Sequence, residues 1–352
     1  MNPKPEPNKP RLSFCIPTYN FGQFLPQTLD SIISQDNGHI EIVIVDGNST
    51  DNTDQIIHEY QQRFPRLTFF KRDKRCGVDR DILKSVELAQ SDYCWLFSAD
   101  DVLSPGAIDL IFQNLTGQWN IAILNFMLCD YNLNPITSHD ILNSADKHKT
   151  YNWSDPAELN DYLSRSLTST ALFSFISSII VNRNDWLAAD PCTEFHDSCW
   201  IIQAKAYAIA KNNLTLWYYP DPVFLKRGEN DSFLYLGIAG RVELALDKFP
   251  AIAQHFWGKN SPIHRAAKRV TRNEISFSSL LVFKEKASQH NESLTKLYNV
   301  IRRSWIRYKR DHLSFLIIRL FPISLIYQLR DLCKKNASLF RMVKSIQTKL
   351  DL

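Results

Sequence analysis

Residues 40–51 read IEIVIVDGNSTD and residues 93–101 read YCWLFSADD. Each stretch is an apolar run of strand length that ends in aspartate residues. In an α/β sheet, ligands bind in the crevice at the carboxyl ends of the strands. Adjacent aspartates suit a hard divalent cation, which prefers oxygen ligands and usually also takes phosphate oxygens of a substrate. The pattern therefore indicates a nucleoside-diphosphate substrate rather than a dinucleotide cofactor.

Strand-like and helix-like runs alternate on both sides of these stretches, up to about residue 130. The expected strands are 12–16, 40–46, 67–71 and 93–97. The expected helices are 24–33, 53–64, 79–89 and one that begins at Ser104-Pro105. Strands that alternate with helices predict an α/β fold, with a mainly parallel sheet and helices on both faces.

The rest of the chain is less regular in pattern. Residues 131–155 are polar and predicted to be a loop, and residues 156–263 look mixed. From about residue 264 the pattern is helical. We therefore expect a helical extension after the α/β part.

The charge of the chain is unevenly divided. Its 352 residues carry a net charge of +4. Residues 1–263 hold 22 Lys and Arg against 31 Asp and Glu, whereas residues 264–352 hold 19 against 6. An acidic body with a basic tail indicates two roles in one chain. Seven cysteines without a C-x-x-C pair, and a polar start without an apolar leader, predict a reducing, cytoplasmic location.

Four motifs follow one another in the first third of the chain. They are FCIPTYN at 14–20, IVDGNSTD at 44–51, GVDR at 77–80 and SADD at 98–101. In order and spacing they resemble the motifs of inverting glycosyltransferase family 2, whose members have a GT-A fold. A nearer resemblance, to abequosyltransferase-like enzymes of O-antigen assembly, rests on GVDRD at 77–81, YCWLF at 93–97 and RGENDSF at 227–233.

The resemblance covers about residues 11–235 and carries an expected domain plan. It implies a GT-A catalytic domain at 11–263, with a donor half at about 11–130 and an acceptor half at about 131–263. Residues 264–352 are then a basic helical C-terminal region.

The resemblance also implies a donor site. The turn Pro17-Thr18-Tyr19 would line the nucleotide pocket, and Asp46 would accept a hydrogen bond from the base. Arg80 would reach the base or a phosphate, because a guanidinium fork suits phosphate oxygens. The residues alone leave open that the first turn is an ordinary strand-to-helix connection.

The SADD motif stands where the family has Asp-x-Asp, with Ser98 in place of the first aspartate. The resemblance makes Asp100 the ligand of a divalent metal, Mn²⁺ or Mg²⁺. It places Asp101 beside the donor, where it would support that ligand or replace it. Capping of a helix is the alternative for Asp101. Arg227 lies in a late loop that would close over the donor and stabilise the leaving diphosphate. For this loop, a polar turn before the next helix is the alternative.

An inverting transfer needs a general base that removes the proton of the acceptor hydroxyl. The family carries an acidic pair about a hundred residues after the metal motif, where this chain has Glu194-Phe195-His196-Asp197. Asp197 and His196 are the expected catalytic residues, and Glu194 is the third candidate. Two alternatives stay open: Asp197 caps the following helix, and His196 is a third metal ligand.

The C-terminal tail is basic and partly apolar. Residues 302–352 hold 12 Lys and Arg against 3 Asp and Glu, and aromatic residues such as Trp305, Phe315 and Phe321 lie between them. The apolar stretch is too short and too broken to span a bilayer. A basic amphipathic segment predicts attachment to an anionic membrane surface. The alternative is packing on the catalytic domain or on a second copy in a homo-oligomer. Nucleic acid is not an expected partner, because no nucleic-acid module accompanies the basic residues.

Residues and resemblance together predict a metal-dependent inverting glycosyltransferase. It would move a sugar from a nucleoside-diphosphate sugar to a glycan acceptor, lipid-linked, at the inner face of the cytoplasmic membrane, in surface-polysaccharide synthesis. A nucleotidyltransferase is disfavoured, because residues 17–24 hold one glycine and no basic residue. A dehydrogenase is disfavoured because no G-x-G-x-x-G follows the first strand. A non-catalytic scaffold that binds nucleotide-sugar is the alternative that Ser98 leaves open.

Overall fold

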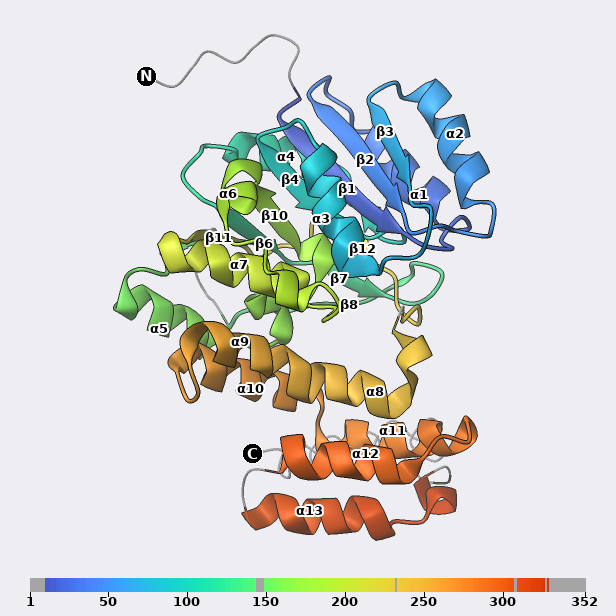
Figure 1. Cartoon of the computed structure of the whole chain (residues 1–352), viewed down its shortest axis with the longest axis vertical. Helices are drawn as coiled ribbons and strands as arrows, with labels where there is room; N and C mark the ends of the chain where they lie inside the picture. Colours follow the sequence, from blue (N-terminus) through green and yellow to red (C-terminus); the bar gives the residue numbers. More distant parts are fainter. Residues whose placement is uncertain (1–9, 144–148, 232, 307–308, 327, 329–352) are drawn as a thin grey trace. The chain divides into compact units, whose positions relative to one another are not determined.

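The structure is a computed structural model that describes residues 10–143, 149–231, 233–306, 309–326 and 328. The chain forms two compact units, Met1–Asn230 (unit 1) and Asp231–Leu352 (unit 2). Figure 1 shows strands and helices in unit 1 and helices in unit 2. The sequence places the end of the catalytic domain at residue 263, and that boundary stays a prediction.

Unit 1 is built on an eight-stranded sheet. In spatial order its strands are β3 (Leu67–Lys71), β2 (Ile40–Asp46), β1 (Leu12–Thr18), β4 (Tyr93–Leu96), β10 (Ile179–Asn182), β6 (Ile121–Leu124), β11 (Thr215–Tyr219) and β9 (Lys149–Asn152). Only β10 and β9 run antiparallel to their neighbours. The bounds of β2 and β3 agree with the sequence prediction, and the mainly parallel sheet is confirmed.

Helices cover both faces of this sheet (Figure 1). They are α1 (Leu25–Ile33), α2 (Thr53–Arg63), α3 (Val78–Leu88), α4 (Ala107–Asn114), α5 (Pro156–Arg165), α6 (Arg183–Ala188) and α7 (Ile201–Asn212). Side chains alternate between the faces along a strand. In β1, Phe14 lies in one core cluster with Leu29 of α1 and Ile108 of α4, whereas Cys15 contacts Ser85 of α3.

Helix α4 begins two residues later than the expected hydroxyl-proline start. Gly106 takes a left-handed φ of +80°, so Ser104-Pro105-Gly106 form a turn instead of the first helical turn. The amide of Ala107 closes this turn by donating to the carbonyl oxygen of Ser104 at 3.2 Å. The hydroxyl-proline pattern was therefore a correct signal for a helix nearby but a wrong signal for its first residue.

Residues 131–155, predicted as loop, contain two strands. β8 (Pro135–Ser138) belongs to a second sheet of four strands, beside β7 (Met127–Cys129), β12 (Phe224–Lys226) and β5 (Val102–Leu103). All four residues of β8 are exposed, so the strand has no apolar alternation that a sequence pattern could reveal. Its backbone bonds to β7 define it instead.

Unit 2 is helical throughout the residues that the structure describes. Its α-helices are α8 (Gly237–Glu243), α9 (Phe249–Trp257), α10 (Pro262–Glu274), α11 (Phe277–Gln289), α12 (Leu294–Val300) and α13 (Lys309–Leu320). The helical part thus begins with a 3₁₀ helix, Leu234–Leu236, earlier than the expected residue 264. Buried side chains that include Val242, Leu280 and Leu297 form a core cluster within this unit.

Trp305 belongs to that core rather than to an exposed surface. Its side chain is 1% exposed, and its Nε1 donates to the carbonyl oxygen of Ile275 at 2.8 Å. Trp305 is therefore not available for contact with a membrane, and the residues that it packs against lie in unit 2. Within the described ranges, none of the helices combines the length and the hydrophobicity needed to cross a bilayer.

Candidate active site

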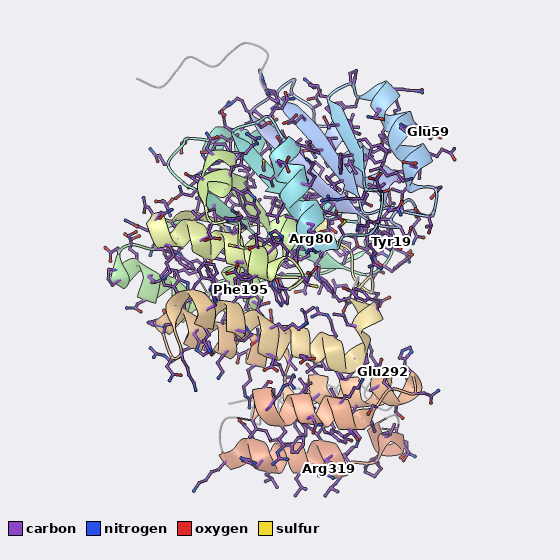
Figure 2. All side chains as sticks on the ribbon, viewed as in Figure 1. Tyr19, Glu59, Arg80, Phe195, Glu292 and Arg319 are labelled. Carbon is purple, nitrogen blue, oxygen red and sulfur yellow. The ribbon has the colours of Figure 1, made fainter. Side chains whose placement is uncertain are left out.

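The carboxyl ends of three parallel neighbours, β2, β1 and β4, lie side by side in the sheet. They carry Asp46, Thr18 and the turn to Asp100. Strand β10 is antiparallel to β4, so its amino end brings Ser177 to the same edge. Figure 2 labels Tyr19, which follows β1 at this edge. The structure therefore brings Thr18, Tyr19, Asp46 and Asp100 to one edge of the sheet.

The turns after β1 and β2 are tied to each other by hydrogen bonds. The amide of Asn20 donates to Ser49 Oγ at 2.8 Å, and the amide of Thr50 donates to Asn20 Oδ1 at 2.8 Å. Asp46 is fully buried and accepts from the amide and the hydroxyl of Ser49. Burial raises the pKa of Asp46, and the bonds from Ser49 oppose the rise. Because Asp46 has no exposed surface, a nucleobase reaches it only if this turn rearranges.

Basic residues after β3 adjoin these turns. The guanidinium of Arg75 lies 4.2 Å from the centre of the Tyr19 ring. Arg72 donates from Nε to the buried carboxylate of Asp81 at 2.9 Å. A Cβ added to Gly47 would come within 3.0 Å of Asp81 Oδ2, so glycine leaves room for this carboxylate beside the nucleotide turn.

The two aspartates after β4 have different surroundings. Asp100 accepts from Ser98 Oγ and from Asn230 Nδ2, the latter at 2.8 Å. Asp101 is 1% exposed and accepts from Ser177 Oγ at 2.6 Å. Burial, followed by repulsion from Asp100, raises the pKa of Asp101 to about 8. The sequence did not point to Asn230 or Ser177 as partners of this pair.

Arg227 is buried beside the same pair. Its guanidinium donates to the carbonyl oxygens of Asp100 (3.1 Å) and Tyr131 (2.6 Å) and to Gln27 Oε1 (2.6 Å). Its backbone amide donates to Asp101 Oδ1 at 3.1 Å. In this arrangement Arg227 braces the Asp100-Asp101 turn, and its contact with a diphosphate stays a prediction that requires the side chain to move.

The candidate base residues lie in the loop before α7. Asp197 is exposed and forms a bidentate ion pair with Arg80, which lowers the pKa of Asp197. The ring of His196 contacts the carbonyl oxygen of Pro191 through Nε2 at 3.2 Å. A carbonyl only accepts, so Nε2 carries the hydrogen and Nδ1 is the nitrogen that can take a proton. Glu194 lies in the preceding 3₁₀ turn, Thr193–Phe195.

Asp79 of the GVDR motif also contacts the loop before α7, although the sequence analysis assigned it no role. It is 2% exposed and accepts from the amides of Cys199 (2.7 Å) and Ile201 (3.3 Å). Burial raises its pKa to about 6, and the backbone donors oppose the rise. Asp79 thus caps the start of α7 from another helix, a role that a spacing of 120 residues hides from sequence reasoning.

Comparison with known proteins identifies the family. The model of "Glycosyl transferase family 2" matches residues 13–175. The abequosyltransferase RfbV of Salmonella typhimurium is 31% identical over 280 residues, which are 75% of this chain and 80% of that protein. The chain belongs to glycosyltransferase family 2. The predicted enzyme class and the resemblance to this family are thereby confirmed.

Solved structures share the fold of this glycosyltransferase. TarS 1–349 of S. aureus in complex with UDP-GlcNAc has 12% identity and a TM-score of 0.57, over 92% of this chain and 91% of that one. The mannosyltransferase PcManGT of Pyrobaculum calidifontis, with GDP-Man and Mn²⁺, has 16% identity and a TM-score of 0.52, over 93% and 88%. At these identities the likeness shows the fold alone, and it confirms the predicted GT-A class.

The residues of this glycosyltransferase fit a divalent cation that is completed by substrate oxygens. In the part of the chain that the structure describes, no three His, Cys, Asp or Glu side chains converge on one point. His196 is therefore not gathered with Asp100 and Asp101 as a third ligand. Magnesium is usually held by one or two carboxylates plus phosphate oxygens. The repulsion between the two aspartates is the feature that a cation would relieve.

Proposed function

We propose that this glycosyltransferase moves a sugar, with inversion, from a nucleoside-diphosphate sugar to a glycan acceptor in surface-polysaccharide synthesis. The observation that carries the proposal is the pair Asp100-Asp101 on the edge that also holds the turns after β1 and β2. Similarity to an abequosyltransferase supports an acceptor of the surface-polysaccharide class. A lipid-linked acceptor and dependence on a divalent metal are parts of the same proposal.

In the proposed reaction, one group of residues binds the donor and another removes the proton of the acceptor. Asp100 would hold Mn²⁺ or Mg²⁺, which supplies charge stabilisation to a departing diphosphate. Tyr19 and Asp46 would bind the nucleotide. His196 or Asp197 would take the proton of the acceptor hydroxyl as that oxygen attacks the sugar carbon from the face opposite the diphosphate. The proton then resides on the base until solvent removes it.

A thermal-shift screen tests the donor class directly. The full chain is heated with UDP-, GDP- and CDP-sugars, each with Mn²⁺, with Mg²⁺ and with chelator. A ligand at 100 times its Kd stabilises the folded state by about 2.7 kcal/mol, and the melting temperature should rise by several degrees. The rise should require the metal. ATP serves as the control, because a shift with nucleoside triphosphates alone would point to a nucleotidyltransferase instead.

We further propose that unit 2 attaches the enzyme peripherally to the inner face of the cytoplasmic membrane, through one face of α13. Four apolar side chains with 39–69% exposure define this α13 apolar face: Leu313, Leu316, Ile317 and Leu320. Their spacing of three, one and three residues places them on one side of a helix. Such a stripe is unusual on the surface of a soluble monomer and indicates a surface for a partner.

The charges on α13 support an anionic lipid surface as the proposed partner. The acidic residue of α13, Asp311, is buried and pairs with Arg272 at 2.7 Å. Lys309 and Arg319 of the same helix are exposed. The exposed part of α13 therefore combines leucines with cations, which is the composition of helices that lie in the interface of anionic membranes.

The double substitution Leu316→Glu and Leu320→Glu should release the full-length protein from phosphatidylglycerol vesicles. Full burial of one leucine contributes about 1.5–3 kcal/mol, so even partial burial of two predicts a loss of about tenfold or more in binding. Co-sedimentation at low and high salt measures the loss, and wild-type binding should weaken with salt. Ile136→Glu, at a 64% exposed site on β8, is the matched control. If the double variant still binds vesicles but loses mass in sedimentation, the face joins two copies of the chain instead.

A further inference from the structure

The first turn of α3 makes two kinds of contact with the loop that carries the candidate base. Arg80 forms the bidentate pair with Asp197 and donates to the carbonyl oxygen of His196 at 3.3 Å. Asp79 accepts the amides of Cys199 and Ile201. Neighbouring residues of one helical turn thus hold both ends of the segment 196–201 (Figure 2 labels Arg80).

The loop has a shape that needs such support. Cys192 and Cys199 take φ values of +56° and +65°, a region that side chains other than glycine rarely adopt. The N-cap residue of α7, Trp200, makes no side-chain capping bond. Strained backbone persists where the surroundings over-determine it, and it is often found at functional sites. Here Asp79 supplies the missing acceptors, because its buried carboxylate has two backbone donors from this loop.

The same turn of α3 also reaches the nucleotide side of the site. Arg72 donates to the carbonyl oxygen of Arg80 at 2.8 Å and to Asp81 at 2.9 Å. Asp81 in turn lies next to Gly47, at the end of β2. One helical turn therefore connects the nucleotide turn with the loop of the candidate base.

We propose that Asp79 and Arg80 are positioning residues of the transfer reaction: they hold the loop His196–Ile201, and with it the general base, at the ligand edge of the sheet. This inference rests on the proposed function, since it assumes that the base is His196 or Asp197. It gives Arg80 a role different from the donor contact that the sequence predicts. The Arg80 guanidinium donates to the carbonyl oxygens of Cys76 and His196 and to the carboxylate of Asp197.

Because the Arg80–Asp197 ion pair is exposed, an effect of its loss on turnover can be distinguished from an effect on folding stability. The side chains of Arg80 and Asp197 are 37% and 78% exposed. Ion pairs as exposed as this contribute little to folding stability. Loss of Arg80 should therefore leave the melting temperature nearly unchanged, so that a change in turnover reports on the placement of the loop.

The test compares Arg80→Gln and Asp79→Asn with Glu87→Gln, a control on the exposed side of the same helix. The full chain is given the nucleotide-sugar that the wild type turns over among UDP-, GDP- and CDP-sugars, with a lipid-linked glycan fraction as acceptor. Arg80→Gln should lower kcat about 10²-fold, the loss typical of a misplaced reacting group. Its Kd for the nucleoside diphosphate should stay at the wild-type value.

A double-mutant cycle gives a readout that a purely structural role would not move. If Arg80 acts through the loop, Arg80→Gln combined with Asp197→Asn should lose no more turnover than the worse single variant. For Asp79→Asn, faster hydrogen exchange of the amides of Cys199 and Ile201 should accompany the loss of kcat. If Asp79→Asn fails to fold, the double-mutant cycle of Arg80→Gln and Asp197→Asn still tests the inference.

Three outcomes overturn the inference. One is wild-type kcat in Arg80→Gln. Another is a raised Kd for the nucleoside diphosphate with normal kcat, which would make Arg80 a donor-binding residue. The third is full additivity in the cycle, which would mean that Arg80 and Asp197 act independently. If the wild-type chain turns over no nucleotide-sugar at all, the proposed function itself fails, and that result is visible before any variant is made.

Discussion

Asp100→Asn should reduce turnover by roughly 10³-fold while the protein stays folded. The metal is expected to supply several kcal/mol of stabilisation to the charge on the departing diphosphate, and each 1.36 kcal/mol is a factor of ten in rate. Asparagine has nearly the shape of aspartate and keeps one oxygen that can accept from Ser98 or Asn230. Removal of the negative charge also ends its repulsion of Asp101, so the pKa of Asp101 should fall from its value of about 8.

The measurement for Asp100 is kcat with and without chelator. Chelation should lower the activity of the wild type to the level of the variant and should hardly change the variant itself. Asp109→Asn, at an exposed position of α4, is the matched control and should behave as the wild type. If the wild-type protein keeps its full kcat in the presence of chelator, neither the metal-binding role of Asp100 nor the requirement for a metal holds.

The base substitutions should have the second-largest effect, and His196→Ala should cost more than Asp197→Asn. Loss of a general base typically lowers the rate by about 10²–10⁴-fold. Pairing with Arg80 lowers the pKa of Asp197, which makes this carboxylate a weaker base. His196 presents Nδ1 as its proton acceptor, because Nε2 donates to Pro191. Histidine is also the side chain best suited to proton transfer near neutral pH.

Binding of donor distinguishes the roles that His196 could play. In His196→Ala, the thermal shift with nucleotide-sugar and Mn²⁺ should match that of the wild type, since a base is not needed for binding. Loss of the metal-dependent shift would instead make His196 a ligand. Normal turnover in both variants would move the base elsewhere, and Glu194→Gln would then be the next variant.

The sequence predicted the sheet well because the deciding signals are local. Strand β2 has the predicted bounds because its buried apolar run ends abruptly at a polar turn, and the partly buried β3 also has its predicted bounds. The prediction failed at β8 because its four residues are all exposed and show no apolar alternation, although its partner β7 ends only a few residues earlier in the chain. Sequence reasoning thus recovers strands with an apolar pattern and misses strands whose residues are all exposed.

In the candidate active site, too, the sequence predicted some residues and missed others. Asp46, Asp100 and Asp101 lie on one edge, as the alternation of strands and helices predicts. The partners of Asp100 and Asp101 were not predictable, because Asn230 and Ser177 are 130 and 76 residues away along the chain. Likewise, no local pattern shows that Arg227 is occupied by carbonyl oxygens of its own chain.

Strand β10 has a consequence for how the protein is made. It pairs with β4, and the 3₁₀ turn that leads into it, Ile176–Ser178, holds Ser177, which accepts from the amide of Ser98 and donates to Asp101. When Asp101 is added to the growing chain, its partner Ser177 is still 76 residues from being added. At about 5–20 residues per second, that interval is roughly 4–15 s. During this interval the edge of β4 that β10 covers has no partner strand, so it is open to pairing with other chains until β10 is made.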